Sequence, residues 1–401
     1  MKPKVLLTHP GTQYSYHLAE QLERLGLLYK YVTSFTIPSD GVIKTVYNLL
    51  PKSVKRKLGT RLINIPACKV KQNPVLELKA LIKIKQGETS EAAFYERNKA
   101  FQLAISDELI KEADIVIGFD TSSWILAERC KKLGKRFILD VSIGHPIAKE
   151  SIYKQLADLY PEWLEQIKPK SDILIGLESQ EIELADAIVV PSDFVRGTYV
   201  NNGVIPDKII VNPFGTNVAA FNNVPHQYTS PSFLFFGGLT ARKGLPFLLK
   251  VWADIIKKYP ECTLILAGYG RLPDGTLLPE NVKNLGIIAP AERQKIFDMA
   301  DIFVFPSFFE GLAQVQIEAA ACGLPVIGTT QSGATNLVAE GKSGFVIIPG
   351  DSTALFNAME YFIQNPHQIK IMGACAREIS LGNFTWDSYG DRWEKILVNE
   401  V

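Results

Sequence analysis

The strongest constraint on the fold is an alternation of short apolar runs with segments of helical periodicity along the chain of 401 residues. Glycine, proline or polar residues bound each run. This alternation is typical of β–α units, which build parallel sheets covered by helices. The expected strands fall into two groups, at 5–8, 115–119, 137–141, 187–191 and 209–212, and at 233–236, 264–267, 302–305, 326–328 and 345–348.

Chain length and the two groups of strands predict an α/β protein with two Rossmann-like domains. A chain of 401 residues is long for one domain and suits two of roughly 200 residues. We expect the first domain over residues 1–215 and the second over 216–380. The polar segment 212–232, which contains prolines and asparagines, is the expected linker.

The amino-acid composition indicates which broad class of protein this chain belongs to. The chain is 47% hydrophobic and 21% charged with a net charge of +1, which indicates an ordinary globular protein without general affinity for nucleic acid. The amino-terminal residues do not resemble a signal peptide, and prolines and glycines interrupt the longest uncharged stretches. The five cysteines lack Cys-x-x-Cys spacing, so we expect reduced thiols. The expected location is the cytoplasm.

Two glutamates give the clearest functional signal. Glu310 and Glu318 flank the start of an expected helix at about 312–322, which follows a turn at Gly311 and ends at Gly323. At about 1.5 Å per residue their Cα atoms are at most roughly 12 Å apart. Carboxylates that act as an acid/base pair on a glycosidic bond lie about 5 to 9.5 Å apart, so this spacing favours two contacts along an extended ligand. Free N–H groups at the helix start suit a phosphate, and the implied ligand is a sugar joined to a nucleotide through phosphates.

This arrangement resembles the signature of the family-four (group 1) retaining glycosyltransferases of the GT-B fold. In that family the first glutamate meets the donor sugar and the second meets the ribose. The stretch 235–244, Phe-Phe-Gly-Gly-Leu-Thr-Ala-Arg-Lys-Gly, is similar to the family's turn that carries a lysine for the donor diphosphate, and Lys243 falls on that lysine. Gly238 stands where many members have an arginine, so one contact to the diphosphate is either missing or supplied by the neighbouring Arg242. Asn336 replaces a glutamate that usually follows a Gly-Gly turn.

The resemblance implies two facing Rossmann-like domains and a helix within 381–401, at 386–398, that returns to the first domain. Donor binding is expected in the second domain and acceptor binding in the first, with Gly11 approaching the donor phosphates and His145 lying near the reacting sugar. Asp140, His9 and His17 are further candidates in the first domain. The full set of expected site residues is Glu310, Lys243, Arg242 and His145 for catalysis, and Gly11, Gly238, Gly311, Leu312, Ala313 and Glu318 for the donor.

A basic segment stands apart from these motifs. Residues 44–86 contain eleven Lys or Arg against one acid, Glu77, with apolar residues such as Val46 and Leu49 between them. Three interpretations stay open: a solvated basic face, an anionic membrane surface at which a lipid-linked acceptor would lie, and a soluble anionic acceptor. Attachment at the membrane would make the protein peripheral on its inner face.

The resemblance predicts hexose transfer from a UDP- or GDP-sugar to a hydroxyl of a glycan or lipid-linked acceptor, with retention of anomeric configuration, as in cell-surface polysaccharide or lipopolysaccharide synthesis. No residue is an obvious nucleophile, so the leaving diphosphate is expected to accept the acceptor proton. The chain has no Asp-x-Asp motif, and we expect no metal and no cofactor. The alternatives are a sugar epimerase or phosphorylase on the same fold, and a scaffolding subunit that kept the fold without activity.

Overall fold

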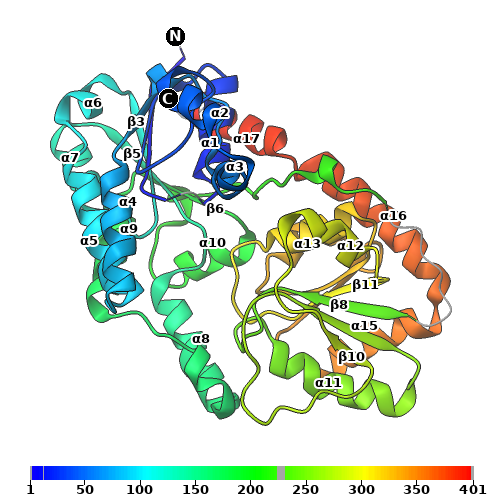
Figure 1. Cartoon of the computed structure of the whole chain (residues 1–401). Coiled ribbons are helices and arrows are strands. Elements are labelled where there is room, and N and C mark those ends of the chain that lie inside the picture. The colour runs from blue at the N-terminus through cyan, green and yellow to red at the C-terminus, as the bar shows by residue number, and fades with distance from the viewer. Residues whose placement is uncertain (1, 12, 224–230, 399–401) are drawn as a thin grey trace.

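The computed structural model describes residues 2–11, 13–223 and 231–398, and it contains two separate parallel sheets (Figure 1). The first sheet has seven strands in the order β3-β2-β1-β4-β5-β6-β7. Its strands are β1 (Val5–His9), β2 (Leu28–Thr33), β3 (Val70–Gln72), β4 (Ile115–Phe119), β5 (Arg136–Asp140), β6 (Ala187–Val190) and β7 (Ile209–Val211).

The second sheet has six strands in the order β10-β9-β8-β11-β12-β13. They are β8 (Ser232–Phe236), β9 (Thr263–Ala267), β10 (Val282–Asn284), β11 (Ile302–Phe305), β12 (Val326–Thr329) and β13 (Gly344–Ile347). Every neighbouring pair of strands in both sheets is parallel. The predicted fold class, two Rossmann-like α/β domains, is therefore confirmed.

Helices cover both sheets, as parallel strands require. Around the first sheet lie α1 (Ser15–Arg24), α2 (Gly41–Leu49), α3 (Lys52–Leu58), α4 (Pro74–Lys85), α5 (Ser90–Leu103), α6 (Asp107–Glu112), α7 (Trp124–Lys132), α8 (Pro146–Leu159), η3 (Pro161–Gln166), α9 (Asp172–Leu184) and α10 (Asp193–Val200). Around the second lie α11 (Leu245–Lys258), α12 (Arg293–Phe297), α13 (Gln314–Ala321), α14 (Ala334–Leu337), α15 (Ser352–Gln364) and α16 (Pro366–Asn383).

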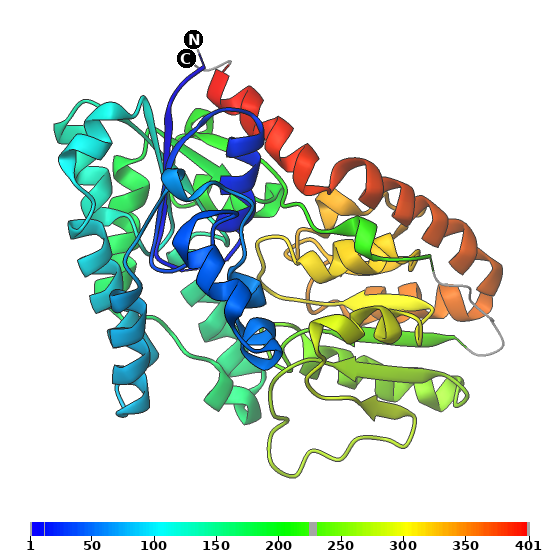
Figure 2. The same cartoon turned by 45° about the horizontal axis from the view of Figure 1, so that its top comes forward.

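The last described helix, α17 (Trp386–Val398), lies on the first domain, although it follows α16 of the second (Figure 2). Its side chains Tyr389 and Trp393 are fully buried, and Arg24 of α1 forms an ion pair with Asp391. The burial of the two aromatic side chains makes α17 part of the first domain's core.

The chain thus crosses between the domains twice, and the two crossings lie side by side. Thr216 N–H donates to the carbonyl of Phe384 at 2.8 Å, and Arg392 donates to the carbonyl of Pro213 at 2.6 Å. The predicted linker 212–232 begins at the first crossing, but its residues 224–230 lie outside the described part of the chain. Within the described residues, no helix is long and apolar enough to cross a membrane.

Candidate functional site

Glu310 forms the centre of a charged cluster at the carboxyl ends of β8 and β11. Its carboxylate pairs with Lys243 and Arg242, and the same Arg242 group donates to the carbonyl of Phe309 at 2.6 Å. Ser307 Oγ donates to the carbonyl of Arg242 at 2.9 Å, which joins the turn after β8 to the turn after β11. The sequence predicted these three charged residues separately, and the structure brings them together.

The cluster fixes the ionisation of its members. Burial by itself raises the pKa of Glu310, but Lys243 and Arg242 outweigh it and leave the pKa below its ordinary value. Burial lowers the pKa of Lys243, and Glu310 opposes that effect. At neutral pH the cluster therefore holds two cations against one carboxylate, and this surplus positive charge suits a diphosphate.

Glu318 lies on α13, which begins at Gln314, so Glu310 belongs to the turn before the helix. Gly323 ends the helix with a positive φ of 84°, and Leu324 N–H returns to the carbonyl of Ala319 at 3.1 Å, as in a Schellman motif. Among the described residues, the N–H groups of Gly311 and Leu312 have no hydrogen-bond acceptor. These groups stand where the sequence predicted phosphate binding.

Glu318 has a partner that the sequence analysis missed. Arg293, the first residue of α12, pairs with one carboxylate oxygen of Glu318 at 2.5 Å and lies over the ring of Phe236. The other oxygen of Glu318 is buried and has no hydrogen-bond partner among the described residues. Burial raises the pKa of Glu318, and Arg293 opposes this. An unpaired buried acceptor is costly, so this oxygen is available for a hydroxyl of a ligand.

Gly311 touches the first domain directly. A Cβ atom at Gly311 would lie 2.0 Å from the carbonyl oxygen of Ser142, which follows β5. Ser192 Oγ, after β6, donates to the carbonyl of Gly311 at 2.6 Å. The turns at the carboxyl ends of both sheets therefore meet around the residues that follow Glu310.

Asn336 and Asp193 form a second contact between the domains. The side-chain oxygen of Asn336 accepts from the N–H of Asp193 at 3.0 Å, and its NH₂ group donates to the Asp193 carboxylate at 2.8 Å. A glutamate at position 336 would face the carboxylate of Asp193. Asparagine thus replaces the family's glutamate at the position that contacts Asp193 of the first domain.

Gly238 lies beneath an aromatic ring. A Cβ atom at this position would be 3.1 Å from the ring of Tyr269, which follows β9 and is 63% exposed. Gly268 and Gly270 flank Tyr269 with φ values of 134° and 126°, and a Cβ at Gly268 would overlap the carbonyl of Gly237. The two glycine turns are therefore packed together, and Tyr269 lies against Gly238 in the turn that carries Arg242 and Lys243.

Of the candidates in the first domain, His145 lies near the charged cluster, whereas Gly11 contacts His9 of its own domain. His145 is buried beside Tyr199, its Nδ1 has no described partner, and burial lowers its pKa to about 4. It follows Gly144, which packs on the ring of Phe309, so His145 is close to the turn that carries Glu310. Gly11 donates its N–H to the ring of His9 at 3.0 Å. Among the described residues, no hydrogen bond joins Gly11 to Lys243 or Glu310.

The other first-domain candidates make contacts within that domain and with α17. Asp140 accepts hydrogen bonds from Tyr14 at 3.1 Å and from Tyr389 of α17 at 3.2 Å. His17 stacks on Trp386 with ring centroids 4.0 Å apart. These contacts give Asp140 and His17 a role in attaching α17 to the first domain.

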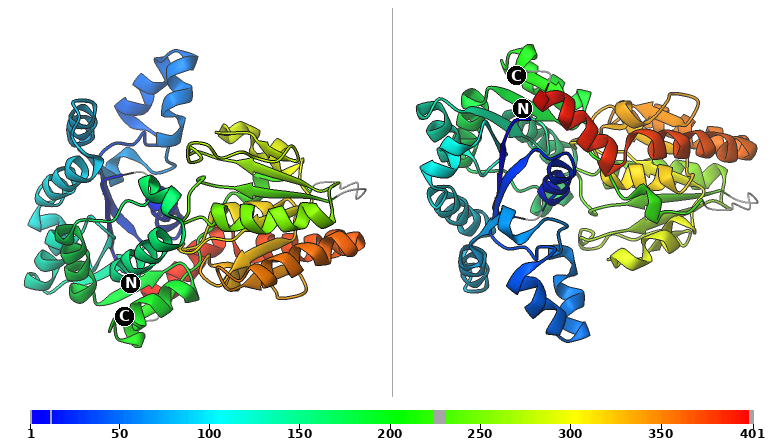
Figure 3. Two further views of the ribbon diagram at one scale, coloured as in Figure 1. Left: turned by 90° about the horizontal axis from the view of Figure 1, so that it is seen from below. Right: turned by 90° about the horizontal axis from the view of Figure 1, so that it is seen from above.

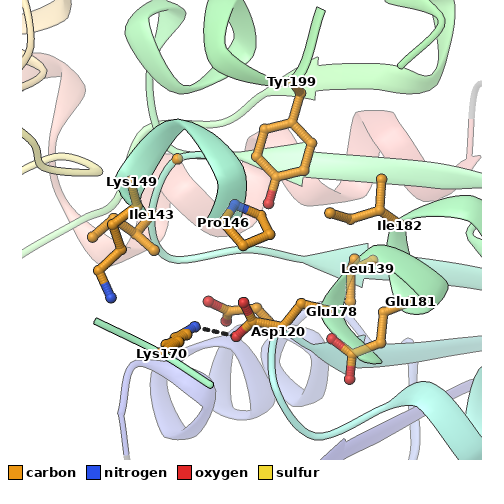
Figure 4. A pocket seen from close by; sticks show the side chains of 11 residues that line it. Asp120, Leu139, Ile143, Pro146, Lys149, Lys170, Glu178, Glu181, Ile182 and Tyr199 are labelled. Carbon is orange, nitrogen blue, oxygen red and sulfur yellow. Dashed lines mark hydrogen bonds and ion pairs between the residues drawn. The ribbon is translucent and has the colours of Figure 1, made fainter. Parts of the chain in front are cut away.

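A narrow cavity, lined by both charged and apolar side chains, adjoins the loop that carries His145 (Figure 4). Asp120, Lys149, Lys170 and Glu178 line it, and Lys170 pairs with Glu178. The hydroxyl of Tyr199 points into this cavity in Figure 4. No motif in the sequence marks this group, because its members come from separate segments of the chain.

Comparison with known proteins fits the geometry of the second domain. Residues 230–365 match the family model described as Glycosyl transferases group 1. The second domain is a group 1 glycosyl transferase domain. Lys243, Glu310 and Glu318 all lie within the matched residues, as do Gly238 and Asn336.

Relatives with curated names match part of the chain. A GDP-mannose-dependent monoacylated alpha-(1-6)-phosphatidylinositol monomannoside mannosyltransferase of Corynebacterium glutamicum is 30% identical over 184 residues, 43% of this chain and 48% of that protein. A D-inositol 3-phosphate glycosyltransferase 2 of Catenulispora acidiphila is 29% identical over 241 residues, 54% of this chain and 56% of that protein. The chain spans about half the length of the curated relatives it matches.

Solved structures match the whole chain in fold. Sucrose-phosphate synthase from Thermosynechococcus elongatus has a TM-score of 0.65 at 19% identity and covers 100% of this chain and 99% of its own. The lipopolysaccharide outer core galactosyltransferase WaaB has a TM-score of 0.62 at 14% identity, with 99% of each chain covered. With its two parallel sheets, the chain has the predicted GT-B fold.

Proposed function

We propose that this chain is a retaining glycosyltransferase that moves a hexose from a nucleoside diphosphate sugar to a hydroxyl of a glycan or lipid-linked acceptor, in the synthesis of a cell-surface glycan. The meeting of Lys243 and Arg242 with Glu310, beside the unpaired N–H groups of Gly311 and Leu312, is the observation that carries the proposal. Names of relatives that include GDP-mannose and a phosphatidylinositol mannoside support a nucleotide-sugar donor and a lipid-linked acceptor.

The proposed mechanism uses placement and charge. Negative charge grows on the diphosphate as the sugar leaves, and Lys243, Arg242 and the two N–H groups stabilise it. Glu310 holds both cations in position and contacts the sugar, while Glu318 offers its unpaired oxygen to the ribose. The leaving diphosphate accepts the proton of the acceptor hydroxyl on the same face, so the anomeric configuration is retained. Two side-chain cations supply the charge that a divalent ion would otherwise provide, and we propose transfer without metal.

Single substitutions in purified protein test the site. Lys243→Ala and Glu310→Ala are expected to lower the rate of nucleoside diphosphate release by a hundredfold or more, since loss of one donor in such a site costs on the order of 2.7 to 4 kcal/mol. Lys250→Ala and Glu280→Ala, at exposed positions of the same domain, are the matched controls. Full turnover by both site variants would contradict the assignment.

The same assay separates the alternatives. A sugar epimerase would convert the nucleotide sugar without any acceptor, whereas a scaffolding subunit would bind nucleotide without turnover. Proton NMR of the product then reports the anomeric configuration, and inversion relative to the donor would exclude the proposed mechanism. Unchanged turnover after treatment with EDTA is the expected result for metal-independent transfer.

A further inference from the structure

Helix α2 presents an apolar stripe to solvent. Val42, Val46 and Leu49 are spaced four and three positions apart, so they share one face of the helix. These side chains are 80%, 53% and 82% exposed, and no residue of α2 is buried. A surface helix of a globular protein normally turns such a stripe toward the core. The apolar face of α2 has no partner within the described chain.

Helix α4 repeats this pattern. Val75, Leu78 and Ile82 are spaced three and four positions apart and are 52%, 58% and 44% exposed. Ala80 is the one buried residue of this helix. Figure 3 shows α2 and α3 projecting from the first domain on the side where α4 also lies. We call residues 41–85, with these three helices, the α2–α4 surface.

The α2–α4 surface is anchored at its base. Ile37 N–H donates to the carbonyl of Arg61 at 2.8 Å, and Ile63 N–H donates to the carbonyl of Ile37 at 3.0 Å. The carboxylate of Asp40, which precedes α2, accepts from the N–H of Ala67 at 2.6 Å. Ile37, Ile63 and Ile65 are buried. The segment therefore packs through its base and leaves the helical faces outward.

Most of the cations on this surface are not neutralised by protein carboxylates. Arg61, Lys69 and Lys83 pair with Glu77, Glu23 and Glu88. Within the described residues no carboxylate pairs with the remaining eight basic side chains of the segment, which are Lys44, Lys52, Lys55, Arg56, Lys57, Lys71, Lys79 and Lys85.

We propose that the α2–α4 surface docks on an anionic lipid bilayer. The exposed apolar side chains would enter the headgroup region while the unpaired cations contact lipid phosphates. A soluble polyanion would engage the cations but would leave two exposed apolar stripes without a role, so a lipid surface accounts for both features. Docking needs neither donor nor acceptor. A failure of lipid binding is therefore distinguishable from a failure of the proposed transfer reaction.

Co-sedimentation of the full chain with vesicles tests the proposal. The protein is expected to sediment with vesicles of phosphatidylcholine and phosphatidylglycerol, to remain in solution with phosphatidylcholine alone, and to be released by salt. Lys52→Glu, Arg56→Glu and Lys57→Glu together should weaken binding on the order of a hundredfold. The matched control is Lys283→Glu, Lys342→Glu and Lys370→Glu, which changes net charge equally at exposed positions of the second domain and should retain binding.

A second pair of variants tests the apolar stripe. Val46→Ser with Leu49→Ser should reduce binding to anionic vesicles, whereas Leu277→Ser with Ile287→Ser, at positions 92% and 80% exposed in the second domain, should not. Equal sedimentation with neutral and anionic vesicles would overturn the proposal. Loss of binding in the charge variant with no effect of the serine variant would also overturn it, because charge alone would then suffice, as for a soluble polyanion.

Discussion

The turn that carries Tyr269 limits the space for a side chain at Gly238. The ring of Tyr269 occupies the space into which a side chain would extend, and the flanking glycines hold that ring in place. Tyr269 is exposed and lies against the turn that leads to Arg242 and Lys243, so we expect its hydroxyl to contact a ligand held by the charged cluster. Gly238 and Tyr269 are therefore coupled, and a change at one alters the other.

A double-mutant cycle tests this coupling. Gly238→Ala should displace the Tyr269 ring by a few tenths of an ångström, change the stability by less than about 0.5 kcal/mol, and weaken donor binding severalfold. In a Tyr269→Ala background the same substitution should have little further effect, because the displaced group is already gone. Donor affinity from calorimetry gives the coupling energy. Additive effects would show that the two positions act independently.

At the scale of elements, the amino-terminal end of α10 meets α14 across the two domains. Asn336 satisfies the first N–H of α10 and also donates to the carboxylate of Asp193. Together with the bond from Ser192 to Gly311, this contact ties the donor-binding turn to the first domain. The contact between α10 and α14 is thus one determinant of how firmly the domains close.

Exchanging the two side chains tests the contact between α10 and α14. Asn336→Asp places two carboxylates together and should favour the open arrangement by at most about 1 kcal/mol, since the pair is partly exposed. Adding Asp193→Asn restores one donor and one carboxylate and should restore closure. Small-angle X-ray scattering with bound nucleotide measures the effect as a change in radius of gyration. A double variant that stays as open as the single one would contradict this role.

The expected strands were correct where the run is apolar, including the edge strands β7 and β13. The omitted strands are β2, β3 and β10, and their sequences explain the omission. Strand β2 carries Lys30, and β3 and β10 are three-residue strands at the sheet edges with exposed side chains. Each omitted strand contains a lysine, and β3 and β10 are also only three residues long, so none of the three gives a clear apolar run.

The residues of the candidate site also fall into two groups, those that the sequence could indicate and those that it could not. Lys243, Glu310 and Glu318 lie in local motifs, so the sequence could indicate them. Arg293 and Tyr269 reach the site only through tertiary packing between separate β–α units. The spacing of residues along the sequence does not indicate such contacts. The same holds for the pairing of Asn336 with Asp193, which joins residues of different domains.

For the whole molecule, two buried histidines set part of the pH dependence of stability. Burial lowers the pKa of His9 and of His145 from 6.5 to about 4. Between these values the unfolded chain binds protons that the folded chain does not, so stability falls as pH decreases. Buried carboxylates such as Asp140 and Glu181, whose pKa values burial raises, act in the opposite direction. The contribution of a histidine therefore appears as a difference between variant and wild type.

Substitution of one histidine isolates this contribution. His145→Gln should remove a loss of up to about 1.4 kcal/mol per pH unit between pH 6.5 and about 4, so its free energy of unfolding should fall less steeply on acidification. Urea unfolding at several pH values gives the two profiles. His367→Gln, at an exposed position of α16, is the control and should follow the wild type. Parallel profiles for His145→Gln and wild type would contradict the prediction.

The paired crossings at Thr216 and Phe384 have a mechanical consequence. Two domains joined by one chain segment can rotate relative to each other in many directions. Two hydrogen-bonded segments side by side restrict that rotation to one axis, which runs through the crossings. Opening then becomes a swing about that axis, and displacement grows with distance from it. The turns that contact each other across the interface therefore separate and approach along one path. A ligand that binds while the domains are apart would contact the same groups each time the domains close.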